Sequence, residues 1–208
     1  MIKKAVWILF VVLAIVIGLY PFLYFFIDRK FGLLASKSSE LLMDILWNIG
    51  FYTHIVLGGI ALLIGWVQFS STFRQKNMAW HQKIGKLYVI LVLISAITGI
   101  YIGFFATGGI VTALGFISLG CIWFYTTLMA YIHIKNKHVL KHQQMMIYSY
   151  AACFAAVTLR LWLPTLMAIF GNFITAYMIT AWVCWIPNII VAYFMNRNLE
   201  QQRIKGKI

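Results

Sequence analysis

Acidic residues are nearly missing from this sequence. Only four of its 208 residues are Asp or Glu, against 17 Lys and Arg, and the formal net charge is +13. Asp28, Glu40 and Asp44 lie in the N-terminal quarter, and Glu200 lies near the C-terminus. None of them falls within a long apolar stretch, which excludes acid–base catalysis by a carboxylate inside a membrane.

Familiar catalytic and metal-binding motifs are missing as well. The three cysteines, Cys121, Cys153 and Cys184, are odd in number and far apart, which argues against a disulfide framework and a zinc site. We expect them to be small packing residues. The sequence has no glycine-rich nucleotide loop, no pair of catalytic carboxylates and no serine-nucleophile motif.

Apolar residues are abundant instead, since 63% of the chain is hydrophobic, only 10% is charged and the mean hydropathy is +0.89. A membrane-spanning helix needs roughly 20 apolar residues. Six such stretches are present, at about residues 5–27, 48–70, 84–106, 110–133, 145–168 and 173–195. We predict an all-α integral membrane protein with six transmembrane helices, a single domain over residues 1–208, with the second to fifth spans as a four-helix core.

The first span has some features of a secretory signal. Lys3 and Lys4 precede it, and Leu34-Ala35-Ser36 faintly resembles a cleavage site. Its apolar run is too long for a signal peptide, so we expect a retained span.

The positions of the basic residues predict the topology. With six spans, only Arg29, Lys30 and Lys37 fall on one side of the membrane. Cytoplasmic loops collect Lys and Arg, so we expect both termini in the cytoplasm, most simply that of a bacterium with this protein in its plasma membrane. The charge therefore reflects topology and does not indicate a nucleic-acid partner. The residues on the basic side are Lys3, Lys4, Arg74, Lys76, Lys83, Lys86, Lys135, Lys137, Lys141, Arg197, Arg203, Lys205 and Lys207.

A short internal similarity relates the two basic loops, at an offset of 61 residues. It aligns His81-Gln82 with His142-Gln143. A tyrosine follows within two turns of helix in each copy, Tyr88 in the first and Tyr148 or Tyr150 in the second. The second and third spans would then form one helix hairpin, and the fourth and fifth a parallel copy of it.

Two histidines at the cytoplasmic side are candidate haem ligands. His81 begins the third span and His142 begins the fifth, and each heads a stripe of small or polar residues at helical spacing. Neutral imidazole is a good ligand for haem iron. The alternative is that both are interfacial histidines that contact lipid phosphates.

A second candidate site lies toward the outer side. His54 and Arg160 stand at comparable depths in the second and fifth spans, and Tyr101 and Trp162 are near enough in sequence to join them. Intramembrane charge is costly and marks function. The pocket would suit a quinone, a haem propionate or a small acid. Alternatively, Arg160 reaches lipid phosphates, backbone carbonyls or Asp44, and His54 is a hydrogen-bonded core residue.

Taken together, these residues resemble a family of bacterial multi-pass membrane proteins, domain-of-unknown-function family 2306, over roughly residues 54–188. Tyr148 departs from that family's pattern, in which we would expect arginine, so a second cationic contact on the fifth span is in doubt. The resemblance is carried by His54 with Gly58-Gly59, Gly65 and Gln68-Phe69, by Arg74, by His81 with Gly85-Lys86-Leu87-Tyr88, by His142, by Thr158-Leu159-Arg160-Leu161-Trp162-Leu163-Pro164, and by Trp182 with Cys184-Trp185-Ile186-Pro187-Asn188.

In outline, that family's core is similar to the two-haem transmembrane cytochromes of the b type. The likeness implies one haem b between His81 and His142, whereas His54 has no histidine opposite it, because His133 lies at the other end of its span. The expected function is then a membrane oxidoreductase that works with a membrane or cytoplasmic redox partner. The rival is a non-enzymatic small transporter or accessory subunit that binds an anion or lipid at His54 and Arg160.

Overall fold

The computed structural model describes residues 2–26 and 32–204, which are helical with no strand. Asp28, Arg29 and Lys30 of the predicted outer loop lie outside the described residues. Six segments are long and apolar enough to cross a membrane, which confirms the predicted number of spans. They are Lys4–Phe25, Ile45–Phe69, Met78–Gly103, Ile110–Lys135, Val139–Phe170 and Phe173–Arg203.

The helices extend further than the apolar stretches predicted. The fifth segment begins at Val139 rather than near residue 145, and the sixth continues to Arg203 rather than ending near 195, because polar residues continue both helices beyond the apolar stretch. The elements are α1 (Ile2–Leu19), η1 (Tyr20–Phe25), η2 (Gly32–Ser36), α2 (Ser39–Met43), α3 (Ile45–Gly65), η3 (Trp66–Phe69), α4 (Ser71–Lys76), α5 (Met78–Gly103), α6 (Ile110–Lys135), α7 (Val139–Cys153), α8 (Ala155–Phe170), α9 (Phe173–Val183) and α10 (Ile186–Ile204).

Four helices enclose the main core. The packing runs from α3 to α5, from α5 to α6, from α6 to α7, and back from α7 to α3, so α5 and α7 face each other diagonally. Ala61, Tyr88 and Val92 are completely buried there, and Trp123 nearly so. The stripes of small or polar residues predicted on the third and fifth spans turn inward on α5 and α7.

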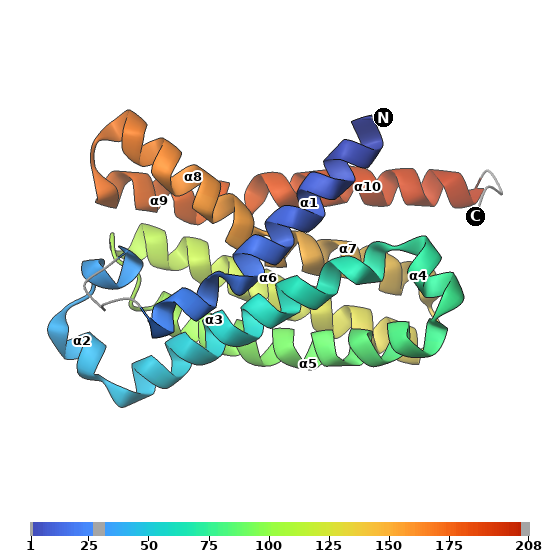
Figure 1. Cartoon of the computed structure of the whole chain (residues 1–208), viewed down its shortest axis with the longest axis horizontal. Coiled ribbons are helices and arrows are strands. Elements are labelled where there is room, and N and C mark those ends of the chain that lie inside the picture. The colour runs from blue at the N-terminus through green and yellow to red at the C-terminus, as the bar shows by residue number, and fades with distance from the viewer. Residues whose placement is uncertain (1, 27–31, 205–208) are drawn as a thin grey trace.

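The remaining helices lie around this bundle. In Figure 1, α1 crosses over α3, the α8–α9 hairpin projects at one end, and α10 runs along α7 toward the other. The approach of α1 is close because Gly18 and Gly59 meet: a Cβ on Gly59 would lie 2.7 Å from the Gly18 carbonyl oxygen. The start of α1 and the end of α10 lie toward the same end of the molecule as α4 (Figure 1), as an even number of spans requires.

The last two segments are each interrupted, and the two interruptions lie side by side. Helix α7 gives way to α8 at Phe154, and α9 gives way to α10 at Cys184 and Trp185. The Asn188 amide donates hydrogen bonds to the carbonyl oxygens of Ala151 and Cys184 and to Thr158 Oγ1, at 3.1 to 3.3 Å. Thr158 Oγ1 in turn donates to the Cys184 carbonyl. Asn188 and Thr158 therefore satisfy backbone groups that the breaks release, as a membrane interior requires.

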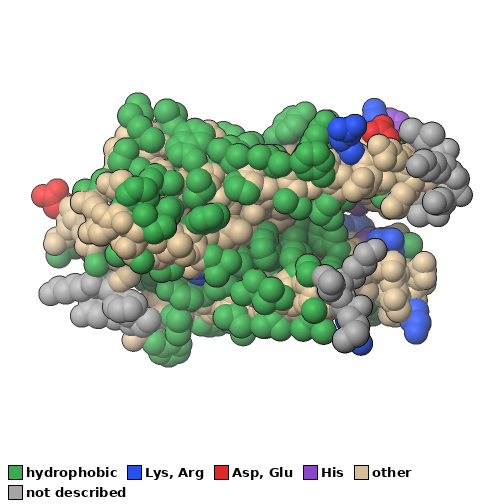
Figure 2. Space-filling model, turned by 90° about the horizontal axis from the view of Figure 1, so that it is seen from above, with side chains coloured by type: hydrophobic (Ala, Val, Ile, Leu, Met, Phe, Trp, Pro, Cys, Tyr) green, Lys and Arg blue, Asp and Glu red, His purple; other side chains and the backbone are tan. Residues whose placement is uncertain are grey.

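Charge is sorted to the two ends of the molecule. Hydrophobic side chains cover the middle, and Lys and Arg gather at one end (Figure 2). We call this end, defined by α4, the starts of α5 and α7 and the ends of α6 and α10, the basic end. Lys37, Glu40 and Asp44 lie at the opposite end, where η2 and α2 precede α3.

The two helix hairpins predicted by the internal similarity are present. Helices α3 and α5 form one, and α6 and α7 form the other, with α3 and α6 both running toward the basic end. Tyr88 and Ser149 occupy equivalent positions in the two hairpins, since they are 61 residues apart. They meet across the core, where the Tyr88 hydroxyl lies 3.0 Å from Ser149 Oγ.

Candidate functional site

His81 and His142 both lie at the basic end of the bundle. They come from the first turns of the diagonal helices α5 and α7. His142 Nδ1 lies 2.8 Å from the Ala130 carbonyl oxygen of α6. If that nitrogen donates, Nε2 is left as the nitrogen with a free lone pair, which is the arrangement that orients metal-binding histidines.

Other polar atoms around these histidines are buried without hydrogen bonds. His81 Nδ1 and Gln68 Nε2 have no partner in the described chain. Gly85 lies one turn along α5 from His81, and a Cβ added there would meet a single atom, Gln68 Oε1 at 3.7 Å. Unpaired buried polar groups are uncommon and ask for an explanation. We refer to His81, His142, Gln68, Gly85 and the Ala130 carbonyl as the His81–His142 site.

A hydrogen-bonded layer closes this site toward the middle of the membrane. Tyr88 OH lies 3.0 Å from Ser149 Oγ, which lies 2.6 Å from Thr127 Oγ1. Tyr150 OH donates to the Leu62 carbonyl oxygen at 2.9 Å. These five residues are all nearly or completely buried, so the layer separates the two ends of the bundle with a packed, internally satisfied barrier.

His54 lies beyond this layer. Its Nδ1 is 2.8 Å from the Ser95 carbonyl oxygen and 3.2 Å from Ser95 Oγ. Its ring packs edge-on against Trp123 of α6, with ring centroids 6.5 Å apart. Trp123, on the helix diagonal to α3, thus lies opposite His54, and its indole ring is not a metal ligand. Between His81 and Ser95, α5 rises by about 21 Å.

Arg160 of α8 points toward the first span. Its Nη1 donates to the Ala156 carbonyl oxygen at 2.8 Å, and its Cζ lies 4.2 Å from the centre of the Tyr20 ring. Its Nε is buried without a hydrogen bond. Asp44 instead accepts from Trp47 N at 2.6 Å as the N-cap of α3. No carboxylate among the described residues forms an ion pair with Arg160. We call this cluster the His54–Arg160 site.

The two other residues predicted for this pocket lie elsewhere. Trp162 is 40% exposed, and residues two apart on a helix do not share a face, so it is turned away from Arg160. Tyr101 packs against Gly50 and stacks edge-on with Phe105. Tyr20 was missed, because nothing in the sequence indicates which face of the first span meets α8.

Lys37 joins two loops at the end opposite the basic end. Its Nζ donates to the Phe105 carbonyl oxygen and to Thr107 Oγ1, and the Ser36 hydroxyl lies 3.0 Å from Thr107 Oγ1. Burial lowers the pKa of Lys37 from 10.5 to about 8.

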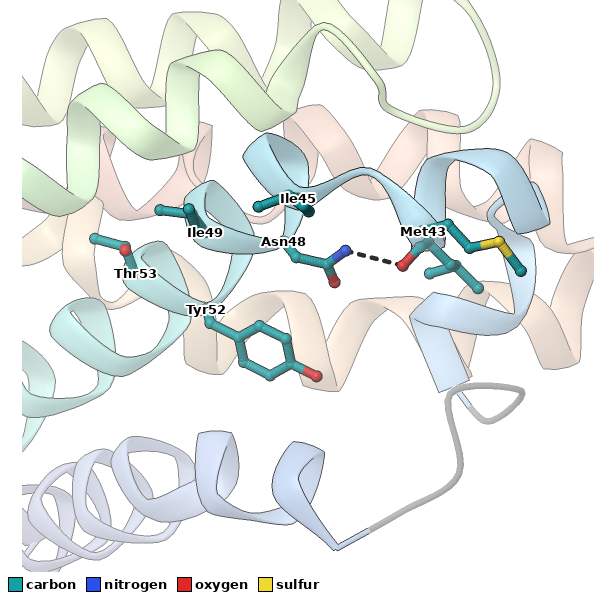
Figure 3. A pocket seen from close by; sticks show the side chains of 7 residues that line it. Met43, Ile45, Asn48, Ile49, Tyr52 and Thr53 are labelled. Carbon is teal, nitrogen blue, oxygen red and sulfur yellow. Dashed lines mark hydrogen bonds between the residues drawn. The ribbon is translucent and has the colours of Figure 1, made fainter.

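An open groove of about 650 Å³ runs beside the start of α3 (Figure 3). Asn48 donates from its amide to the Leu42 carbonyl oxygen at 2.8 Å, which holds the corner between α2 and α3. The other walls are mainly apolar, and Met43 and Ile45 are 80% and 77% exposed. None of the predicted site residues lines this groove.

Comparison with known proteins gives one match. The family described as "Predicted membrane protein (DUF2306)" matches residues 51–196, from the first turns of α3 to α10. No curated protein and no solved structure matches this chain.

Proposed function

The chain belongs to the DUF2306 family of predicted membrane proteins, and on that premise we propose that it is a membrane redox protein that holds one haem b between His81 and His142. The observation that carries the proposal is the pair of histidines at the same end of two diagonal helices, together with the unpaired buried atoms His81 Nδ1 and Gln68 Nε2 and the open face of Gly85. This donor set fits a haem, because two imidazoles supply axial ligands and the glycine leaves room beside one of them.

The chain's own residues would position and insulate the haem. Ala130 would hold the His142 ring through Nδ1 and leave Nε2 for the iron. The layer of Tyr88, Ser149 and Thr127 would exclude water from the side facing the membrane interior. The haem supplies one-electron chemistry when it is bound, and the bundle sets its orientation and local dielectric.

The same proposal assigns the topology and the partners. The basic end would face the cytoplasm of a bacterial cell, since Lys and Arg collect on that side of a plasma membrane. A membrane or cytoplasmic redox partner would supply electrons there. The His54–Arg160 site would bind a quinone, with the guanidinium as the hydrogen-bond donor to a quinone oxygen. His54 donates from Nδ1 to the Ser95 carbonyl oxygen, so its Nε2 would act there as an acceptor.

A difference spectrum tests the haem directly. The protein would be purified in mild detergent from cells supplied with a haem precursor, and the dithionite-reduced spectrum compared with the air-oxidised one. We expect a sharp b-type band in the wild type and its loss in His81→Ala and His142→Ala. His54→Ala is the matched control and should retain the band. A flat spectrum from pure, folded wild-type protein would remove the haem proposal.

Gly85 provides a second, independent test of the location. Gly85→Leu places a side chain in the space beside His81 without touching either ligand, so haem content should fall while the protein still folds. Lys86→Leu, at the exposed neighbouring position of α5, would show the effect of a new leucine that points away from the His81–His142 site. If both histidine variants and Gly85→Leu kept full haem, the ligand assignment would be wrong even with the redox class intact.

The guanidinium of Arg160, which no described carboxylate neutralises, favours a second candidate function. A cation within a span costs about 2.5 to 3.5 kcal/mol at the helix centre, and no described carboxylate offsets it. The alternative is therefore a non-enzymatic protein, either a small transporter or an accessory subunit, that binds an anion or lipid at the His54–Arg160 site. In that case Arg160→Ala would abolish binding or transport, and the histidine variants at the basic end would be silent.

A further inference from the structure

Arg74 differs from the other basic residues at the basic end. Lys76, Lys83, Lys86, Lys135, Lys137, Lys141, Arg197 and Arg203 are all exposed, whereas Arg74 is partly buried. Its guanidinium makes no hydrogen bond and no ion pair with the described part of the chain. By contrast, the Lys83 ammonium lies 5.2 Å from the centre of the Trp80 ring. Arg74 is thus a sheltered cation without an assigned partner.

The local structure holds Arg74 beside the His81–His142 site. It lies on α4, which is capped at its start because Ser70 Oγ accepts from Phe73 N at 3.2 Å. Helix α4 packs against η3, which carries Gln68, and against α5, which carries His81.

We infer that Arg74 binds the carboxylate groups of the haem held by His81 and His142, an inference that rests on the proposed function. Haem carries two propionate groups on one edge, and a guanidinium binds a carboxylate through two parallel hydrogen bonds. The sheltered position beside the ligand pair distinguishes Arg74 from the exposed lysines, which remain free to contact lipid phosphates. Arg74 is therefore a binding residue for the charged edge of the haem and sets its orientation.

The test compares haem with its dimethyl ester, in which both carboxylates are neutral. Full-length wild type, Arg74→Gln, Arg74→Lys and the matched control Lys76→Gln, on the same short helix, would each be loaded with either compound. The rate of haem release to excess apomyoglobin would be followed by absorbance. Wild type should release the ester roughly ten- to a hundredfold faster than haem, as expected for the loss of a charge-assisted hydrogen bond.

The ester should make little difference in Arg74→Gln if the inference holds, because the variant has already lost the contact. Lys76→Gln should discriminate as the wild type does, and Arg74→Lys should do so more weakly. Equal discrimination in Arg74→Gln and wild type would overturn the role of Arg74 while leaving the haem proposal intact. A change in release that depends on anionic lipid and not on the ester would also overturn it, in favour of lipid phosphate. Failure of the wild type to bind either compound would overturn the proposed function itself.

Discussion

Replacing Arg160 with methionine separates a functional from a structural role for the intramembrane charge. Methionine keeps an unbranched, flexible side chain, although a shorter one, and removes the guanidinium. The substitution deletes two favourable contacts, the hydrogen bond to the Ala156 carbonyl and the contact with the Tyr20 ring. It also removes the cost of burying the charge and the unpaired Nε donor.

These contributions nearly cancel. A hydrogen bond from a charged donor contributes about 1.5 to 3 kcal/mol, and a cation–π contact about 0.5 to 2. The charge at mid-span costs about 2.5 to 3.5 kcal/mol. The free energy of unfolding of Arg160→Met should therefore lie within about 2 kcal/mol of the wild-type value. This corresponds to a shift in the midpoint temperature of at most roughly 4 to 8 °C for a chain of this size. Ligand binding at the His54–Arg160 site should fall by about tenfold or more.

The assay is thermal unfolding in detergent followed by tryptophan fluorescence, together with binding of a short-chain ubiquinone analogue. Arg197→Met, at an exposed position of the basic end, is the control for loss of one charge. Loss of binding with an unchanged midpoint would support a ligand role. A fall of more than about 10 °C would refute the reasoning, because Arg160 would then be a structural contact between α8 and the first span.

Three further predictions concern the fold. Gly65→Ala should destabilise the protein by about 1 to 3 kcal/mol, since its Cβ would lie 2.9 Å from the Tyr88 ring. Gly85→Ala should be neutral. Both free energies of unfolding would be measured by chemical unfolding, and equal losses of stability would contradict this prediction. Lys37 should make the free energy of unfolding rise between pH 8 and 10.5, because its side chain binds a proton more tightly in the unfolded chain than in the folded one. Lys37→Met should remove this rise. An unchanged pH profile in the variant would contradict the prediction. Asn188→Leu removes the three hydrogen bonds that its amide donates at the paired breaks and should cost about 2 to 3 kcal/mol, measured as a lower unfolding midpoint than that of the surface variant Asn198→Leu.

Much of the fold follows from the length and spacing of the apolar stretches. The six spans are evident because each needs about 20 apolar residues, and the inward position of Tyr88 follows from helical periodicity. The interruption at Phe154 is not evident, because no glycine or proline marks it. Proline is an uncertain guide here, since Pro187 adjoins a break whereas Pro164 lies inside the continuous helix α8.

The candidate sites were predictable in part. The common position of His81 and His142 at the basic end follows from their equal places in two similar hairpins. The contact between Arg160 and Tyr20 depends on how α1 docks against the bundle, which no short motif encodes. The outward position of Trp162 could have been predicted, because Trp162 lies two residues from Arg160 on one helix and therefore on another face.

The duplicated hairpins make the two histidines equivalent by position but not by environment. Ala130 precedes His142 by twelve residues, and the residue in the same relation to His81 is Phe69. Ala130 lies within the regular helix α6, whereas Phe69 ends the tighter turn η3, and His81 Nδ1 has no partner there. The approximate two-fold symmetry of the bundle is thus broken at one point. One imidazole is held by a hydrogen bond and the other is not. If the proposed haem binds there, His142 would meet it with a fixed orientation, and His81 would be the more adaptable of the two residues that hold it.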